Sequence, residues 1–335
     1  MRGYTRIVGL LTALLVISGE AQQGSGKVSG YVFGDYYLVS QHHDPTIKGM
    51  SGFWFRRVYF TYDQKITDQT AIRFRLEMNS PGDFKTADTL KPYVKDAYVQ
   101  YTTGKTQYLL GVLPTPTWEG VETLLGYRPY EKTPVDLWRM GNSRDSGLGI
   151  RTTFGKTQVY FVVGNGSHTQ SETNRGKAVY LSVQHPLNEA WVLEVYGDIY
   201  DRPADSDWRT LHGLLVYRTD RTKVGFQYVH QDRQNQRDLA VFSVYAETRV
   251  AERTRLFARA DWVNNPVPDA DKIGYFALAN NARPSFYQLG IIYEVAKDIY
   301  LAPNVEWVTY GNPPGGGAKP KDVLLLKATF HYLWR

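Results

Sequence analysis

The stretch DVLLLKATFHYLW, residues 322–334, carries the pattern that decides the fold of this chain. Every second residue from Leu324 to Trp334 is apolar, in the order Leu324, Leu326, Ala328, Phe330, Tyr332 and Trp334. The residues between them include Lys327, Thr329 and His331. A period of two predicts a β-strand with one apolar and one mixed face.

The same alternation recurs along the chain. In residues 70–79 apolar positions alternate with Arg73, Arg75 and Glu77, and in residues 255–262 with Arg259 and Asp261. Charges repeated in mid-strand need a wet environment, because burying an unpaired charge is costly. A soluble sandwich would show the same local pattern with its charged face outward, so the number of strands has to decide.

Sixteen segments carry strand patterns, and their connections are alternately short and long. Tight turns at every second connection, with long loops between them, are typical of an up-and-down barrel in an outer membrane. The sequence therefore predicts an all-β, 16-stranded antiparallel transmembrane barrel, with both ends of the mature chain on the periplasmic side. For the strand near 207–218 the facing stays open, because His212 shares a parity with Leu214 and Val216. The segments are 27–40, 52–64, 69–79, 94–103, 105–113, 147–154, 156–164, 177–185, 190–200, 207–218, 222–232, 238–250, 253–264, 284–296, 298–310 and 321–334.

Composition narrows the class of protein further. The 335 residues include no cysteine, which excludes a disulfide framework and thiolate chemistry. Charged residues make up 21% and hydrophobic ones 42%, too apolar for a disordered chain. The net charge of +6 is spread along the sequence, so no nucleic-acid partner is expected. The 25 Tyr and 8 Trp suit strands and membrane-interface girdles.

Residues 1–21 match a secretory signal peptide. Arg2 and Arg6 precede the apolar run Ile7–Ser18, and Gly19-Glu20-Ala21 offers a cleavage site. The run is too short to span a bilayer. An N-terminal anchor or a buried helix is the alternative. The segment predicts export and a barrel formed by residues 22–335.

The connection over residues 114–146 is long and rich in apolar and aromatic residues. Loops of this length that contain no secondary structure of their own are usually functional. We expect it to fold into the lumen as a constriction loop. The alternative is an external loop packed on a neighbouring subunit.

Four stretches are distinctive: the first strand Gly30–Tyr37, the run Gly52–Phe60, the strand Lys95–Tyr101, and Leu110-Gly111-Val112 before the long loop. Together they resemble the phosphate-selective porin O/P family. The resemblance implies a trimeric pore in a Gram-negative outer membrane, surrounded by lipid, that passes small anionic or neutral solutes. Phosphate selectivity is not carried over, because the predicted lumen face interleaves seven bases with eight acids. These are Arg57, Arg73, Arg75, Arg151, Arg249, Arg259 and Lys327, and Glu77, Asp96, Glu194, Asp198, Glu247, Asp261, Glu294 and Glu306.

Two charged groups are expected to face each other across the lumen. A basic wall opposed to an acidic loop would set up a transverse field that favours small polar solutes. Ion pairs that stiffen the loop are an equally good interpretation. The wall is Arg57, Arg73, Arg75 and Arg151, and the loop acids are Glu119, Glu122, Glu131 and Asp136.

The function predicted from these features is passive diffusion of small hydrophilic solutes and ions. One alternative is a selective channel for phosphate-like anions or oligosaccharides, which a continuous track of Tyr59, Tyr98, Tyr160, Tyr196 and Tyr245 would favour. Another is a non-conducting barrel, an adhesin or scaffold. No catalytic arrangement or cofactor motif is present in the sequence, so no enzyme is expected. Neither His42-His43-Asp44 nor Asp269 with Asp271 supplies a full metal shell.

Overall fold

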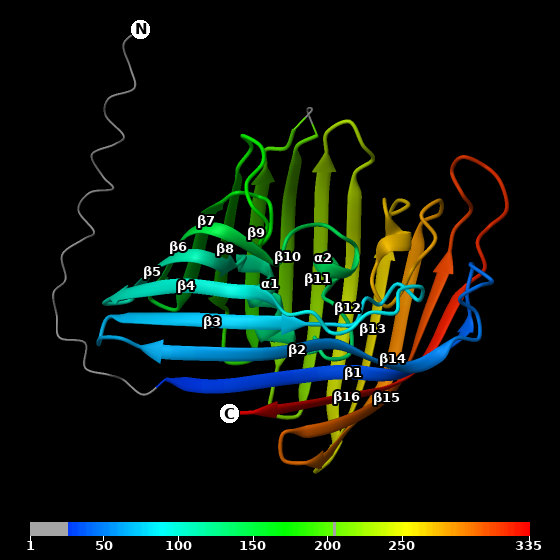
Figure 1. The fold of residues 1–335 in the computed structure, drawn as a ribbon, viewed down its shortest axis with the longest axis horizontal. Helices are drawn as coiled ribbons and strands as arrows, with labels where there is room; N and C mark the ends of the chain where they lie inside the picture. Colours follow the sequence, from blue (N-terminus) through cyan, green and yellow to red (C-terminus); the bar gives the residue numbers. More distant parts are fainter. Residues whose placement is uncertain (1–25, 204–205) are drawn as a thin grey trace, which may run out of the picture.

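The computed structural model describes residues 26–203 and 206–335, so the predicted signal peptide lies outside the described residues. Sixteen antiparallel strands form one closed barrel, which confirms the predicted fold (Figure 1). Predicted and observed strand bounds differ by three residues at most. The strands are β1 (Lys27–Gln41), β2 (Ser51–Lys65), β3 (Thr70–Met78), β4 (Tyr93–Thr103), β5 (Thr106–Pro114), β6 (Arg144–Phe154), β7 (Thr157–Gly164), β8 (Ala178–Pro186), β9 (Trp191–Tyr200), β10 (Trp208–Arg218), β11 (Thr222–Arg233), β12 (Leu239–Ala251), β13 (Thr254–Val263), β14 (Pro284–Ala296), β15 (Ile299–Tyr310) and β16 (Val323–Trp334).

The strands follow one another around the ring, and β16 closes it against β1. Every even-numbered strand before β16 ends in a short turn, such as 104–105 or 155–156, whereas long connections follow the odd-numbered strands. The C-terminus lies beside the start of β1 at the short-turn end of the barrel (Figure 1). This arrangement is the one that the alternating connection lengths predicted.

The two faces of each strand differ as the alternation predicted. In β16, Lys327 is 5% exposed on the inside, while Leu326 is 44% exposed on the outside. Neighbouring outward rings form a row across four strands, through Phe242, Trp262, Tyr287 and Trp307, with successive centroids 5.8, 6.3 and 5.7 Å apart. An apolar outer wall with aromatic rows and a charged inner wall is the surface of a transmembrane barrel.

Strand β10 settles the facing that the sequence left open. His212 is 1% exposed, and Leu214 and Val216 are 0% exposed, so all three point inward. Arg209 and Leu211 share the opposite parity and are exposed. Apolar side chains therefore belong to the inner wall here, because the inside of this part of the barrel is filled by packed groups rather than by water.

Two β-bulges place more charge inside the barrel than strict alternation allows. Phe33 lies opposite Arg57 and Gly34 opposite Phe55, so Arg56 is the extra residue of β2. Lys95 is likewise the extra residue of β4, between Val94 and Asp96. At each bulge two successive charged side chains point inward, since a bulge locally breaks the period of two.

Three short helices complete the described chain: α1 (Pro116–Leu125), α2 (Pro134–Leu137) and η2 (Ala270–Lys272). Helix α1 starts with Pro116 in its first turn and stops at Gly126, whose φ of 71° is left-handed. No helix within residues 26–203 and 206–335 is long and apolar enough to cross a membrane.

Candidate pore site

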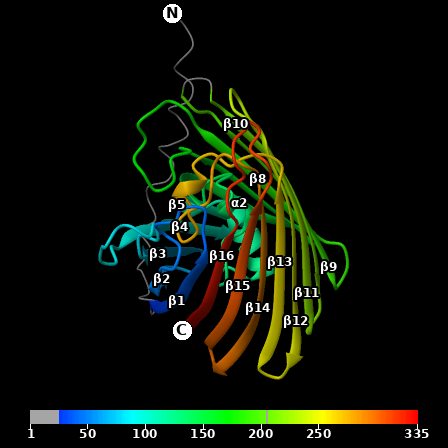
Figure 2. The same ribbon diagram turned by 90° about the vertical axis from the view of Figure 1, so that its right-hand side faces the viewer.

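Residues 115–143, between β5 and β6, form an inner loop that lies inside the barrel. Its helix α1 packs against β7 to β11, and Figures 1 and 2 both place α2 within the ring of strands. Inward side chains donate to loop carbonyls from far around the wall: Lys223 Nζ to Leu125 O at 2.8 Å, Gln231 Nε2 to Met140 O at 2.6 Å, and Lys327 Nζ to Tyr130 O at 3.2 Å. The loop therefore crosses the lumen, as the fold prediction had it.

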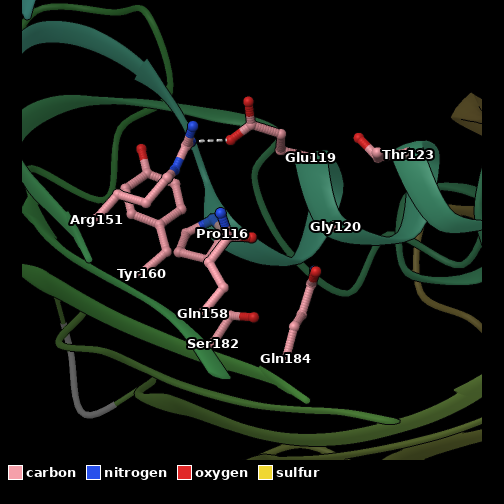
Figure 3. Close-up of a pocket in the computed structure, with 9 residues that line it drawn as sticks. All are labelled: Pro116, Glu119, Gly120, Thr123, Arg151, Gln158, Tyr160, Ser182 and Gln184. Atoms are coloured by element: carbon pink, nitrogen blue, oxygen red, sulfur yellow. Dashed lines mark hydrogen bonds and ion pairs between the residues drawn. The ribbon is translucent and has the colours of Figure 1, made fainter. Parts of the chain in front are cut away.

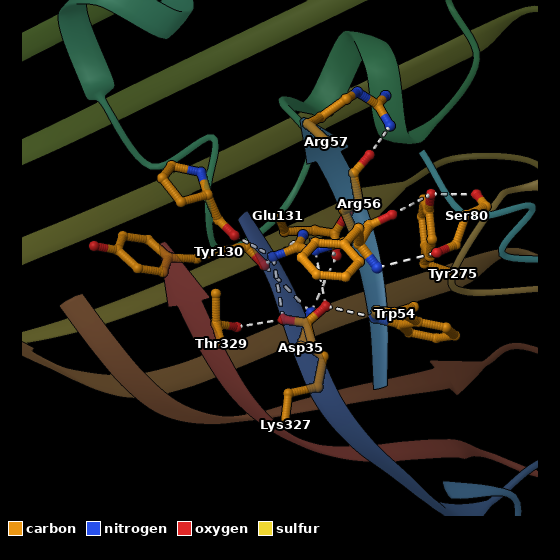
Figure 4. A network of polar contacts seen from close by, with 12 residues as sticks. Asp35, Trp54, Arg56, Arg57, Ser80, Tyr130, Glu131, Tyr275, Lys327 and Thr329 are labelled. Atoms are coloured by element: carbon orange, nitrogen blue, oxygen red, sulfur yellow. Dashed lines mark hydrogen bonds and ion pairs between the residues drawn. The ribbon is translucent and has the colours of Figure 1, made fainter. Parts of the chain in front are cut away.

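Arg56 is the centre of the network that holds the middle of the inner loop (Figure 4). Its Nε lies 2.8 Å from Asp35 Oδ2, and its Nη1 lies 3.7 Å from Glu131 Oε2. The guanidinium also donates to the carbonyls of Tyr130, at 3.1 Å, and Pro129. Asp35 is held in turn by Trp54 Nε1 at 2.7 Å, so every charge of this buried cluster has a partner.

Glu131 is the predicted loop acid that takes part in this network. Lys327 Nζ lies 3.3 Å from its carboxylate and also contacts Glu306. Burial alone would raise the pKa of Glu131, but the positive charges of Lys327 and Arg56 outweigh it and hold that pKa below its usual range. The carboxylate is therefore charged and acts as an anchor for the loop.

A second anchor holds the loop at α2. Trp138 Nε1 donates to Asp261 Oδ2 at 2.8 Å, and the Arg259 guanidinium pairs with the same carboxylate at 2.6 Å. Arg259 also donates to Lys132 O. The predicted lumen charges Arg259, Asp261 and Lys327 are thus buried docking groups for the loop.

The predicted basic wall is paired almost entirely within the sheet. Arg57 Nε lies 2.8 Å from Glu77, Arg73 Nε lies 2.7 Å from Asp63, and Arg75 Nη1 lies 3.2 Å from Asp96. Only Arg151 meets a loop acid, Glu119. Arg249 lies exposed near the short-turn end of β12.

The other two predicted loop acids, Glu122 and Asp136, form ion pairs with Arg128 of the same loop. Arg128 Nε lies 3.2 Å from Glu122, and its Nη2 lies 3.4 Å from Asp136. Arg151 with Glu119 thus joins the predicted wall to a predicted loop acid, while the other charges of both groups are paired within the sheet, within the loop, or with Arg56 and Lys327. The pairing favours the second interpretation, ion pairs that stiffen the loop, and the transverse field stays a prediction.

Sequence reasoning missed several charged residues of this site. Arg56 and Lys95 escaped because a bulge reverses the facing that alternation gives them. Lys95 Nζ lies 3.0 Å from Glu77. A usable signal existed, since two adjacent charged residues inside a strand, as in Arg56-Arg57 and Lys95-Asp96, suit a bulge better than strict alternation. The missed residues include Asp35, Arg56, Asp63, Lys95, Arg128, Lys132 and Arg144.

Two cavities lie on either side of the inner loop. One of about 470 Å³ opens at the short-turn end and is lined by Arg75, Glu122, Arg128 and Arg144 among others. The other, of about 290 Å³, lies toward the long loops and includes Asp136 in its lining. The Arg128–Asp136 ion pair joins the lining of the first cavity to that of the second.

A second segment, residues 264–283 between β13 and β14, reaches across the long-loop mouth. We call it the outer strap. Tyr275 donates through its hydroxyl to Ser80 O at 2.6 Å and through its backbone to Gly82 O at 2.6 Å. Lys132 Nζ joins the strap to the inner loop by donating to Gly274 O at 2.6 Å. Burial lowers the pKa of Lys132 to about 8, although the neighbouring Glu131 carboxylate opposes that shift.

Of the tyrosines proposed as a track, Tyr59 lines the short-turn cavity and Tyr160 lines a separate cavity behind α1, whereas Tyr196 and Tyr245 are covered by other groups. Tyr160, Tyr196 and Tyr245 point inward but are only 5%, 1% and 2% exposed. Tyr127 of the inner loop covers Tyr245, with ring centroids 4.4 Å apart. Among the described residues, no group of three or more His, Asp or Glu side chains is placed to hold a metal ion.

Comparison with solved structures identifies the type of fold. The anion-selective porin from Comamonas acidovorans superposes with a TM-score of 0.65 at 13% identity, over 93% of this chain and all of that one. OmpT, an outer membrane protein of Vibrio cholerae in trimer form, gives 0.64 at 13% identity over 93% and 100%. A mutant of the Rh. blastica porin gives 0.60 at 11% identity over 92% and 100%. No protein-family model and no curated protein matches the sequence. The likeness therefore shows a barrel of the outer-membrane porin type.

Proposed function

We propose that this chain is a porin of a Gram-negative outer membrane, exported by the signal peptide 1–21, through which small hydrophilic solutes and ions diffuse passively. The observation that carries the proposal is the division between the two faces of the closed barrel. Its outside is apolar with aromatic rows, and its inside carries arginine, lysine and carboxylate groups. Such a surface requires lipid outside and accommodates water inside.

The inner loop narrows the solute path in this account. Solutes pass between Arg128 of the loop and the wall formed by β2, β3 and β4, from one cavity to the other. Five cations and four anions surround this passage, so the fixed charge is close to neutral. We expect only a weak preference for anions, because local fixed charge sets ion preference in a narrow pore. The groups are Arg57, Arg75, Lys95, Arg128 and Arg144, with Glu77, Asp96, Glu122 and Asp136.

The resemblance to the phosphate-selective porin O/P family extends, in this proposal, to architecture and trimeric assembly. The comparison with a trimer form of OmpT is in line with a homotrimer. Phosphate selectivity would require unpaired cations along the path. Arg57, Arg73 and Arg75 each have a carboxylate within 3.2 Å, so a phosphate ion would have to displace it.

The test is single-channel recording in a planar bilayer with refolded mature protein. Stepwise conductance is expected, with a small reversal potential of the anion-preferring sign under a KCl gradient and no block by millimolar phosphate. Block by phosphate would instead support the selective channel. Complete silence from protein shown to be folded would favour a non-conducting adhesin or scaffold. Heat-unfolded protein from the same preparation is the matched control.

A further inference from the structure

A separate polar cavity of about 200 Å³ lies behind helix α1, between the inner loop and the inner wall (Figure 3). Helix α1 contributes Pro116, Glu119, Gly120 and Thr123 to it. Glu122 and Gly126 of the same segment line the short-turn cavity instead. The remaining lining comes from β6, β7 and β8. The cavity is therefore a side chamber beside the path, on another face of the helix.

The chamber has a wet mouth and a buried floor. Glu119 and Arg151 form an ion pair at the mouth, with side chains 38% and 22% exposed. Ser182, at the floor, is 3% exposed and donates to Glu194, which is 0% exposed, at 2.7 Å. A solute entering the mouth would lose water progressively, which strengthens each hydrogen bond that it makes inside.

The lining suits a neutral solute with many hydroxyl groups. Gln158 and Gln184 offer amide groups that donate and accept, and Ser182 adds a hydroxyl. The ring of Tyr160 provides a flat face, over which the Arg151 guanidinium lies 4.4 Å from the centroid. Because Arg151 and Glu119 neutralise each other, this ion pair presents no unpaired charge to the chamber.

Gly120 explains why the chamber stays open at its helix side. A glycine inside a helix costs about 1 kcal/mol relative to alanine, so its presence needs a reason. A Cβ at this position would lie 2.4 Å from Gln184 Nε2 and 2.5 Å from Glu194 Oε1. The missing side chain lets α1 approach the wall and leaves the polar ends of these two residues uncovered by a methyl group.

We propose that this chamber is a binding site for a small neutral polyol of about monosaccharide size. At roughly 30 Å³ for each water in the liquid, the volume corresponds to about seven waters, close to that of a hexose. The inference goes beyond passive diffusion, because it gives the barrel a place where a solute is held beside its path.

Calorimetric titration of the folded protein in detergent tests the site without requiring conduction. Glucose and sorbitol are the probes, and gluconate is the anionic comparison. We expect millimolar binding of both neutral probes and no tighter binding of gluconate. Tighter binding of gluconate, or no heat with either neutral probe, would overturn the site. A protein that conducts but binds neither would lose this proposal alone.

The variants Gln184→Leu and Gly120→Ala test whether the probes bind in this chamber. Gln184→Leu removes one amide and should weaken glucose binding about tenfold, as loss of a buried hydrogen-bond partner does. Gly120→Ala should weaken it by pressing a methyl group on Gln184 and Glu194. Gln100→Leu is the matched control. Gln100 also points inward, from β4, but its side-chain amide donates a hydrogen bond to the Thr102 hydroxyl and does not line the chamber. Equal binding by Gln184→Leu and Gln100→Leu would contradict the assignment.

Discussion

Replacing Arg56 by methionine should release the inner loop from the wall. Methionine keeps an unbranched chain but removes the charge that joins β2 to the carbonyls of Pro129 and Tyr130. The change also leaves Asp35 buried at 0% exposure without its cation. Breaking a buried ion pair from one side costs about 3 to 5 kcal/mol. At 1.4 kcal/mol per tenfold, the undocked loop becomes roughly 100- to 3,000-fold more populated.

The assay uses the absence of cysteine from the chain. A single reporter, Val135→Cys, is nearly inaccessible in the docked loop, because Val135 is 2% exposed. Its rate of reaction with a small thiol reagent therefore reports undocking. Adding Arg56→Met to this background should raise the rate by one to three orders of magnitude, limited by the intrinsic rate of the free thiol.

Arg57→Met is the matched control. Arg57 is the next residue on β2, but its partner is Glu77 on the wall rather than the loop. It should leave the labelling rate within about a factor of three, which is below 1 kcal/mol. Equal rates in the Arg56→Met and wild-type backgrounds would refute the docking role of Arg56. Equal acceleration by Arg57→Met would refute its specificity.

Three further outcomes are expected. Arg128→Gln should shift the ion permeability ratio toward cations by about two- to fivefold, because two unit charges at close range in water interact by about 1 kcal/mol. An unchanged reversal potential would show that ions do not pass Arg128. The pKa of Lys132 is about 8, and the charges around it are Glu131, Asp136, Arg57 and Arg128. Lys132 therefore loses its proton as the pH rises from about 7 to about 9, and the preference of the pore for anions should fall over this range. The fall should be absent in the variant Lys132→Met. Tyr275→Phe should destabilise the docked outer strap by about 1 kcal/mol, the contribution of one hydrogen bond. The expected readout is roughly fivefold faster hydrogen exchange of the backbone amide of residue 275. Unchanged exchange would contradict the anchoring contact.

The barrel was predictable because its determinants are local. Alternating faces such as that of residues 322–334, together with alternating turn lengths, are written directly in the sequence and specify strand number and facing. The inward position of Arg259, Asp261 and Lys327 followed from the same period of two.

The pairing of the site charges was not predictable in the same way. A β-bulge turns Arg56 inward against the alternation, and nothing local fixes where an extra residue is accommodated. The partners of Glu131 and Trp138 come from β2, β13 and β16, far away in sequence. The outer strap was missed because residues 264–283 have no strand period, and their apolar residues are buried by packing across the barrel mouth.

Thiol block of a single channel shows whether ions cross the barrel beside Arg128. The variant Arg128→Cys, in the otherwise cysteine-free chain, is opened in a planar bilayer and treated with a charged thiosulfonate. Ala258→Cys, on the outward face of β13, is the control. We expect stepwise current that drops on modification of Arg128→Cys and is unchanged for the control. A current unaffected by full modification at residue 128 would contradict this expectation.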